Sequence, residues 1–177
     1  SPAAETCNGV DDDCDGVVDD GLFCPSLPHL HTPPHVLFYG PNGANERPYL
    51  PTGSVATVAS DAMWRAMTAA QFADYDLIVI GDKDCSGATV DDTQAAYDTR
   101  ATWLPNVNGR IFVSTLDPGC HLPPAAQVYL RDALTWLVAA GGTALYVSGD
   151  WGRRNFDYLS PLGTFSSMTM HADDVRI

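Results

Sequence analysis

The sequence predicts a three-layer α/β fold, in which helices cover both faces of a parallel sheet. Three observations lead to this prediction. Short, continuously apolar runs recur along the chain after residue 34, and each run ends in Gly, Asp or Ser. The segments between these runs carry apolar residues at helical spacing. Continuous apolar strands are typical of parallel sheets buried on both faces, and their alternation with helices is the pattern of βαβ units.

The first half of this pattern contains three strands and one helical stretch. Residues 35–39 (HVLFY) form the first expected strand, which is closed by GPNG. Residues 54–59 (SVATVA) form the second and lead into a helical stretch at residues 61–75. Residues 77–80 (LIVI) form the third and are closed by Gly and Asp. Gly and Asp at these points are typical turn residues, so they mark where each strand ends.

The second half continues the alternation. A helix is expected at residues 93–103, followed by a strand at residues 110–114 (RIFVS). A second helix at residues 126–139 stops before two glycines and leads to a strand at residues 144–147 (ALYV). Five such strands predict a flavodoxin-like sheet, although the sequence leaves their order in the sheet open. The final residues, 168–177, are typical of the start of another strand, so we expect the native domain to continue.

The chain divides into three regions of different composition. Residues 1–24 are acidic and rich in cysteine, residues 25–34 are a proline-rich connector, and residues 35–177 form the α/β domain. The net charge is −13, and seven of the 22 acidic residues precede residue 25, whereas the first Lys or Arg is Arg47. This balance argues against a nucleic acid or an anionic membrane as partner, because binding to phosphate depends on clustered Lys and Arg. A cation is the expected partner.

The cysteines indicate an oxidising compartment. The chain has five of them and no CxxC pair, which argues against zinc-ribbon and thioredoxin-like sites and favours disulfides. The sequence also contains no signal peptide and no apolar run long enough to span a bilayer, so we expect no membrane insertion. We therefore expect a mature or excised piece of an exported protein that is secreted or lies at the cell surface.

The acidic segment matches a calcium-loop template. Asp11, Asp13 and Asp15 fall at loop positions 1, 3 and 5, and Gly16 falls at the turn position 6. The remaining expected ligands are the backbone carbonyl of Val17 at position 7, Asp19 at position 9, and Asp20 and Asn8 as further oxygen donors. Position 12 departs from the template, because Leu22 replaces the bidentate Glu of an EF-hand. The pattern therefore predicts a self-contained loop.

This segment resembles the MopE-type metal-binding motif of secreted bacterial proteins. That motif runs Cys-Asn/Asp-Gly-x-Asp-Asp/Asn-Asp-Cys-Asp-Gly-x-x-Asp-Glu/Asp, and residues 7–20 match it. The core also resembles the calcium loops of thrombospondin type 3 repeats and dockerins. The family label refers to copper, but a carboxylate shell without His or Met suits calcium, so Ca²⁺ is the expected ion. Cys7 and Cys14 are expected to pair across the loop, with Cys24 either left over or paired with Cys7.

The α/β region resembles the glutamine-amidotransferase-like fold, particularly its ThuA-like branch. The resemblance covers residues 34–177 and lies in HVLFYGPNG, FADYDLIVIGD, GRIFVSTLDP and GGTALYVSGD. Active amidotransferases place their nucleophile in a Gly-x-Cys-x-Gly elbow, which DPGCHLPP lacks. We therefore carry over no catalytic residue from that family.

The loops after the strands offer an alternative, catalytic reading. Asp117, His121 and Asp150 follow predicted strands and are expected to line the carboxyl edge of the sheet, where α/β proteins bind ligands. Cys120 is open to two interpretations: a disulfide with Cys85 in the neighbouring loop, or a nucleophile with His121 as its base.

A third possibility concerns the proline-rich connector. His29 and His31 lie on it and His35 directly follows it, and all three are candidate ligands for a transition metal. Capture of a metal would require His29 and His31 to join the acidic loop.

The sequence favours a calcium-stabilised structural or adhesive protein at the bacterial cell surface. Its expected partners are the calcium ion and either other surface proteins or further copies of the chain. The alternative is a hydrolase or carbohydrate-acting enzyme that uses Asp117, His121 and Asp150.

Overall fold

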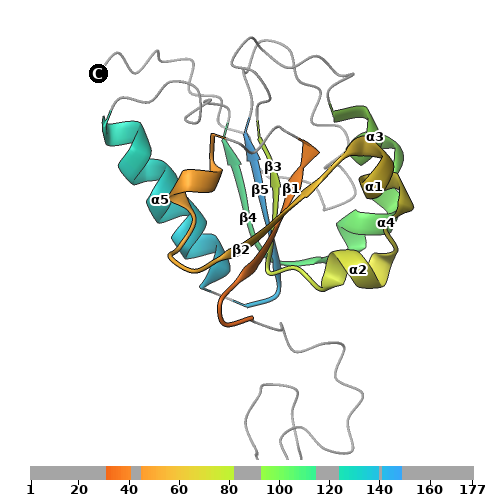
Figure 1. The fold of residues 1–177 in the computed structure, drawn as a ribbon, viewed down its shortest axis with the longest axis horizontal. Coiled ribbons are helices and arrows are strands. Elements are labelled where there is room, and N and C mark those ends of the chain that lie inside the picture. The colour runs from red at the N-terminus through yellow and green to blue at the C-terminus, as the bar shows by residue number, and fades with distance from the viewer. Residues whose placement is uncertain (1–30, 41–44, 82–92, 115–123, 140, 149–177) are drawn as a thin grey trace, which may run out of the picture.

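The chain folds around a five-stranded parallel sheet (Figure 1). The computed structural model describes residues 31–40, 45–81, 93–114, 124–139 and 141–148. The strands are β1 (His35–Tyr39), β2 (Val55–Ala59), β3 (Leu77–Ile80), β4 (Val107–Ser114) and β5 (Thr143–Ser148). Their order in the sheet is β2-β1-β3-β5-β4. The predicted parallel α/β fold is therefore confirmed.

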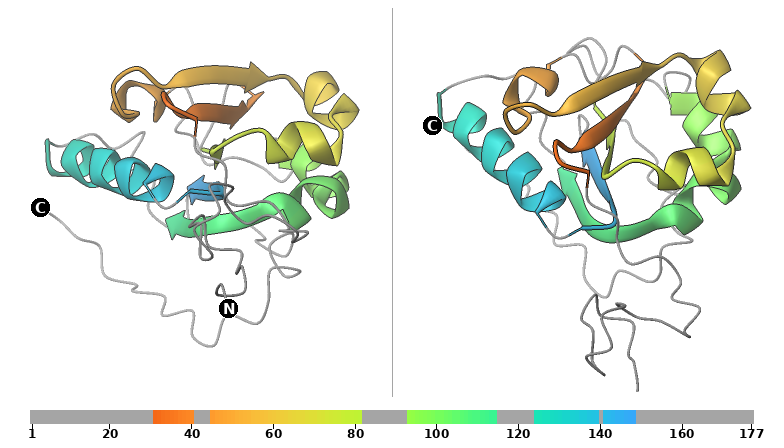
Figure 2. Two further views of the ribbon diagram at one scale, coloured as in Figure 1. Left: turned by 90° about the horizontal axis from the view of Figure 1, so that it is seen from below. Right: turned by 60° about the horizontal axis from the view of Figure 1, so that its bottom comes forward.

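The helices form two layers, one on each face of the sheet (Figures 1 and 2). One layer contains α1 (Asp61–Ala66), α2 (Ala69–Ala73), α3 (Gln94–Asp98) and α4 (Arg100–Trp103), which continues into the 3₁₀ helix η4 (Leu104–Asn106). The other layer contains α5 (Pro124–Val138) and the 3₁₀ helix η2 (Arg47–Tyr49). This arrangement confirms the three predicted layers.

Each face of the sheet has its own apolar core. Trp64, Phe72 and Trp103 from the four-helix layer pack against one set of strand residues, and all three are almost completely buried. Leu130 and Leu134 of α5 pack against the opposite face. Successive residues of a strand point to opposite faces, so the continuously apolar strands supply both cores at once.

The strand order departs from the flavodoxin-like order 2-1-3-4-5, because β5 lies between β3 and β4.

The positions of the helices on the two faces are consistent with one handedness for all the connections between strands. The steps from β2 to β3 and from β3 to β4 run in one direction along the sheet, and both use the α1–α4 face. The step from β4 back to β5 runs in the other direction and uses α5 on the opposite face.

Both helical stretches on the first face are interrupted, which the sequence analysis did not predict. The expected helix at residues 61–75 is divided at Met67, whose ψ of 139° is extended. Thr68 then starts α2 with a capping box, in which its side chain accepts from the Gln71 amide while the Gln71 side chain accepts from the Thr68 amide. The expected helix at residues 93–103 is likewise divided at Thr99.

Candidate functional site

The amino-terminal edge of the sheet carries a buried carboxylate. Asp76 directly precedes β3, and its side chain is completely buried. Its Oδ1 accepts a hydrogen bond from the His31 backbone amide at 3.0 Å, and its Oδ2 accepts one from the His35 amide at 2.7 Å. The Asp76 amide in turn donates to the His35 carbonyl at 2.9 Å. A buried carboxylate needs such donors, because its transfer out of water is otherwise costly.

Asp76 also orients the imidazole of His31. The Nδ1 atom of His31 lies 3.0 Å from Asp76 Oδ2, so it carries the proton of this hydrogen bond. The other ring nitrogen, Nε2, lies 3.9 Å from Asp74 Oδ1. The His31 ring is also stacked on the His35 ring, with centroids 3.7 Å apart and ring planes 9° apart. Two histidines and two aspartates are thus gathered at the start of β1 and β3.

Three of these side chains are candidate metal ligands. One ligand atom from each of His31, His35 and Asp74 lies within 4.8 Å of the other two. Asp74 ends α2, and its side chain is 69% exposed, whereas that of His31 is 28% exposed. The cluster therefore combines ordered imidazoles with a carboxylate that faces solvent. In this part of the structure, the three candidate ligands come from the segment before β1, from the first residue of β1 and from the α2–β3 turn.

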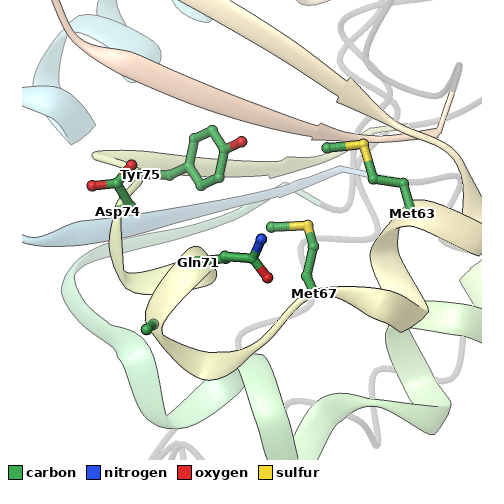
Figure 3. A pocket seen from close by; sticks show the side chains of 6 residues that line it. Met63, Met67, Gln71, Asp74 and Tyr75 are labelled. Carbon is green, nitrogen blue, oxygen red and sulfur yellow. The ribbon is translucent and has the colours of Figure 1, made fainter.

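A shallow pocket adjoins the cluster (Figure 3). Its volume is about 370 Å³, and Asp74 lies at the end away from Met63. The Tyr75 ring and the thioethers of Met63 and Met67 face the space between α1, α2 and β3. Three of its six lining residues, Gln71, Asp74 and Tyr75, carry polar groups that could contact a ligand.

The opposite, carboxyl-terminal edge holds a second buried carboxylate. Glu46 is completely buried, and the Ser148 hydroxyl at the end of β5 donates to its Oε1 at 3.0 Å. Glu46 lies just before η2, in the connection that leaves β1 on the α5 face. The connection that leaves β3 uses the other face. The carboxyl ends of β1 and β3 therefore form a topological switch point, which is where open α/β sheets bind ligands.

A tyrosine of α5 borders the same edge. The Tyr129 hydroxyl interacts with Ser114, the last residue of β4. Burial raises the pKa of Tyr129, and the hydrogen bond with Ser114 partly offsets that rise. Tyr129 therefore remains a neutral phenol near neutral pH.

The structure brings together only some of the residues singled out in the sequence. His31 and His35 meet, as the transition-metal hypothesis requires. The remaining predicted residues lie outside the described part of the chain: Asn8, Asp11, Asp13, Asp15, Val17, Asp19, Asp20, His29, Asp117, His121, Asp150 and all five cysteines. Conversely, sequence reasoning missed Glu46, Asp74 and Asp76. Asp76 precedes an apolar strand, but nothing local indicates that it meets His31, 45 residues earlier.

None of the described helices is both long and apolar enough to cross a membrane. No protein-family model, curated protein or solved structure matches this chain. The resemblances to the MopE-type motif and to ThuA-like domains therefore stay predictions.

Proposed function

We propose that this chain is an exported calcium-binding protein with a structural or adhesive role at the bacterial cell surface. The observation that carries this proposal is the spacing of Asp11, Asp13 and Asp15 with Gly16 in the acidic segment. That spacing directs several carboxylates toward one centre, and hard carboxylate oxygens are the ligands that calcium prefers.

Charge repulsion gives the ion its structural role. Six aspartates lie within residues 11–20, and no lysine or arginine precedes Arg47. Without a cation these carboxylates repel one another and oppose a compact loop. Calcium removes that repulsion, so its binding free energy becomes free energy of folding for the loop.

The α/β domain serves as the scaffold in this proposal. Its amino-terminal edge is where the chain enters from the acidic segment, and only six residues separate Cys24 from His31. Hydrogen bonds from the His31 and His35 amides to Asp76 hold the entering chain against the sheet. A loop ordered by calcium is thereby joined through a short connector to a fixed point on the domain. Its partners are the ion and either other surface proteins or further copies of the chain.

Thermal melts with and without calcium test this role. The full chain, stripped with a chelator, is melted in calcium and in chelator, next to the double variant Asp13→Ala, Asp15→Ala. Calcium at 100 times its Kd is expected to stabilise the wild type by about 2.7 kcal/mol. It is expected to leave the double variant unchanged, because two of its ligands are gone.

Asp12→Ala is the matched control for this experiment. It removes one carboxylate from the same loop, half the charge that the double variant loses, at position 2 of the template, which supplies no ligand. It is expected to keep most of the calcium response. If calcium stabilised Asp12→Ala and the double variant by the same amount, it would act only by screening charge.

A hydrolase or carbohydrate-acting enzyme is the second candidate, and the burial of Glu46 at the carboxyl edge favours it. A buried carboxylate at a topological switch point is a common feature of functional sites in α/β proteins. The proposed catalytic residues are Asp117, His121 and Asp150, in the segments that follow β4 and β5. Hydrolysis of chromogenic esters or glycosides by the full chain, lost in His121→Ala and Asp150→Asn, would support this candidate. Equal turnover by the wild type and both variants would exclude His121 and Asp150 from catalysis.

A further inference from the structure

We propose that His31, His35 and Asp74 form a second metal site, which takes a borderline transition ion such as Zn²⁺. The site lies at the amino-terminal edge of the sheet. It shares no ligand with the acidic calcium loop, so the two proposals stand or fall separately.

The ligand atoms are close to the spacing that zinc requires. Nitrogen and oxygen ligands about 2.1 Å from a tetrahedral zinc lie about 3.4 Å from one another. The Nε2 atom of His31 and Oδ1 of Asp74 are 3.9 Å apart, and the three ligand atoms all lie within 4.8 Å of one another. Because the Asp74 carboxylate is largely exposed, it can rotate toward the ring nitrogens without breaking any packing.

The buried Asp76 supplies a second, independent observation. Histidines that bind metals usually donate their other ring N–H to a carboxylate or carbonyl, which fixes the tautomer and raises the basicity of the ligating nitrogen. Asp76 accepts from His31 Nδ1, so the Nε2 lone pair of a neutral His31 is directed to the side where Asp74 lies. This arrangement is the carboxylate–histidine pair expected behind a zinc ligand.

The same carboxylate also positions the second histidine. Asp76 Oδ2 accepts from the His35 amide at 2.7 Å, so both histidines are held at the backbone by one buried group. Their rings lie side by side before any ion binds. The backbone positions of both histidines are therefore fixed before any ion binds, which lowers the entropic cost of bringing the two ligands together. The two ring planes are nearly parallel, so the rings must rotate before both can bind one ion.

The ligand types select the ion. Two imidazoles and one carboxylate suit zinc, whereas the acidic loop offers only oxygen ligands, which suit calcium. The three ligands found among the described residues fill three positions of a four-coordinate site, and water, a group from another molecule or a residue outside the described segments fills the fourth. Zinc is therefore expected at the amino-terminal edge even when calcium occupies the loop.

The test is a calorimetric titration of zinc into the full chain in a large excess of calcium, which keeps the loop occupied. Asp74→Asn and His35→Gln each remove one ligand and are expected to weaken zinc binding at least tenfold. Asp132→Asn is the matched control, because it makes the same change at an exposed carboxylate on α5, and it is expected to bind as the wild type does. Since Asp74 is exposed, Asn at this position leaves the fold intact.

Cobalt provides a second readout at the same site. Cobalt bound to a His-His-Asp set gives visible absorption bands that are weak or missing for the aqueous ion, and these bands are expected to be lost in His35→Gln. If Asp74→Asn and His35→Gln bound zinc with the same heat and affinity as the wild type, the proposal would be overturned. Zinc binding that disappears instead in Asp13→Ala, Asp15→Ala would place the ion in the acidic loop and would also overturn it. Calcium titrations of Asp74→Asn, expected to match the wild type, keep this outcome separate from any failure of the calcium proposal.

Discussion

Asp76 holds together the amino-terminal edge of the domain. It receives three hydrogen bonds from His31 and His35, two of them from backbone amides. Replacement by Ala leaves these buried donors without an acceptor, and the cost of such a change is a desolvation penalty for each donor.

We therefore predict that Asp76→Ala lowers the free energy of unfolding by about 3 kcal/mol. Urea denaturation followed by circular dichroism measures this change. Asp76→Asn keeps one acceptor oxygen and is expected to lose less. An Asp76→Ala midpoint equal to that of the wild type would show that the network contributes nothing to stability.

The raised pKa of Tyr39 makes the stability of the folded state depend on pH in the alkaline range. Burial, together with the Asp61 carboxylate 3.0 Å from its hydroxyl, raises the pKa of Tyr39 to about 12. An unfolded tyrosine ionises near pH 10. The folded state therefore keeps a proton that the unfolded state releases, and this contribution to stability is complete below pH 10 and is lost as the pH rises to about 12.

Tyr39→Phe removes this titration. The variant is expected to be less stable at pH 7, because the buried Ala95 amide loses the Tyr39 oxygen that accepts from it at 3.2 Å. Between pH 10 and 12 its unfolding midpoint in urea is expected to fall less steeply than that of the wild type. Parallel slopes for the two proteins would show that Tyr39 does not carry the effect.

At the scale of elements, β4 depends on a close approach of its backbone to β5. A Cβ on Gly109 would lie 2.9 Å from the Ala144 backbone nitrogen, and the register of the β4–β5 pair shifts between Val107 and Ile111. The glycine is therefore required where the edge strand is irregular.

Gly109→Ala is expected to lower the free energy of unfolding by about 1–3 kcal/mol, because a rigid backbone must move to admit the methyl group. Thermal melts monitored by circular dichroism measure the loss. A melting temperature equal to or above that of the wild type would mean that the β4–β5 pair adjusts freely.

The strands and helices also show which parts of the fold the sequence predicts correctly. Apolar runs located all five strands, and β1 and β3 have the predicted bounds, because a strand buried on both faces leaves a continuous apolar signal. The breaks at Met67 and Thr99 were missed, although the Thr68–Gln71 capping box is a recognisable local signal for the first of them. Helical apolar spacing continues across such a break, so periodicity alone does not reveal it.

At the scale of the whole molecule, the features that the sequence did not predict are those that depend on long-range contacts. The position of β5 between β3 and β4 follows from packing across the sheet, which local patterns do not encode. The same holds for the cluster at the amino-terminal edge: His31 and His35 were named as candidate ligands, but Asp74 and Asp76 join them only through the pairing of β1 with β3. The acidic loop is the reverse case, because its expected ligands lie within one short segment of the chain and their spacing alone predicts a site.

The two buried carboxylates lie at opposite edges of the sheet. Asp76 accepts hydrogen bonds at the amino-terminal edge, and Glu46 accepts one at the carboxyl-terminal edge.

Calorimetric titration of calcium into the chelator-treated full chain tests the calcium claim most directly. One ion is expected to bind the wild type and Asp12→Ala with similar affinity, and no binding is expected for Asp13→Ala, Asp15→Ala. Absence of heat in the wild type, or equal binding by the double variant, would contradict a calcium site at Asp11, Asp13 and Asp15.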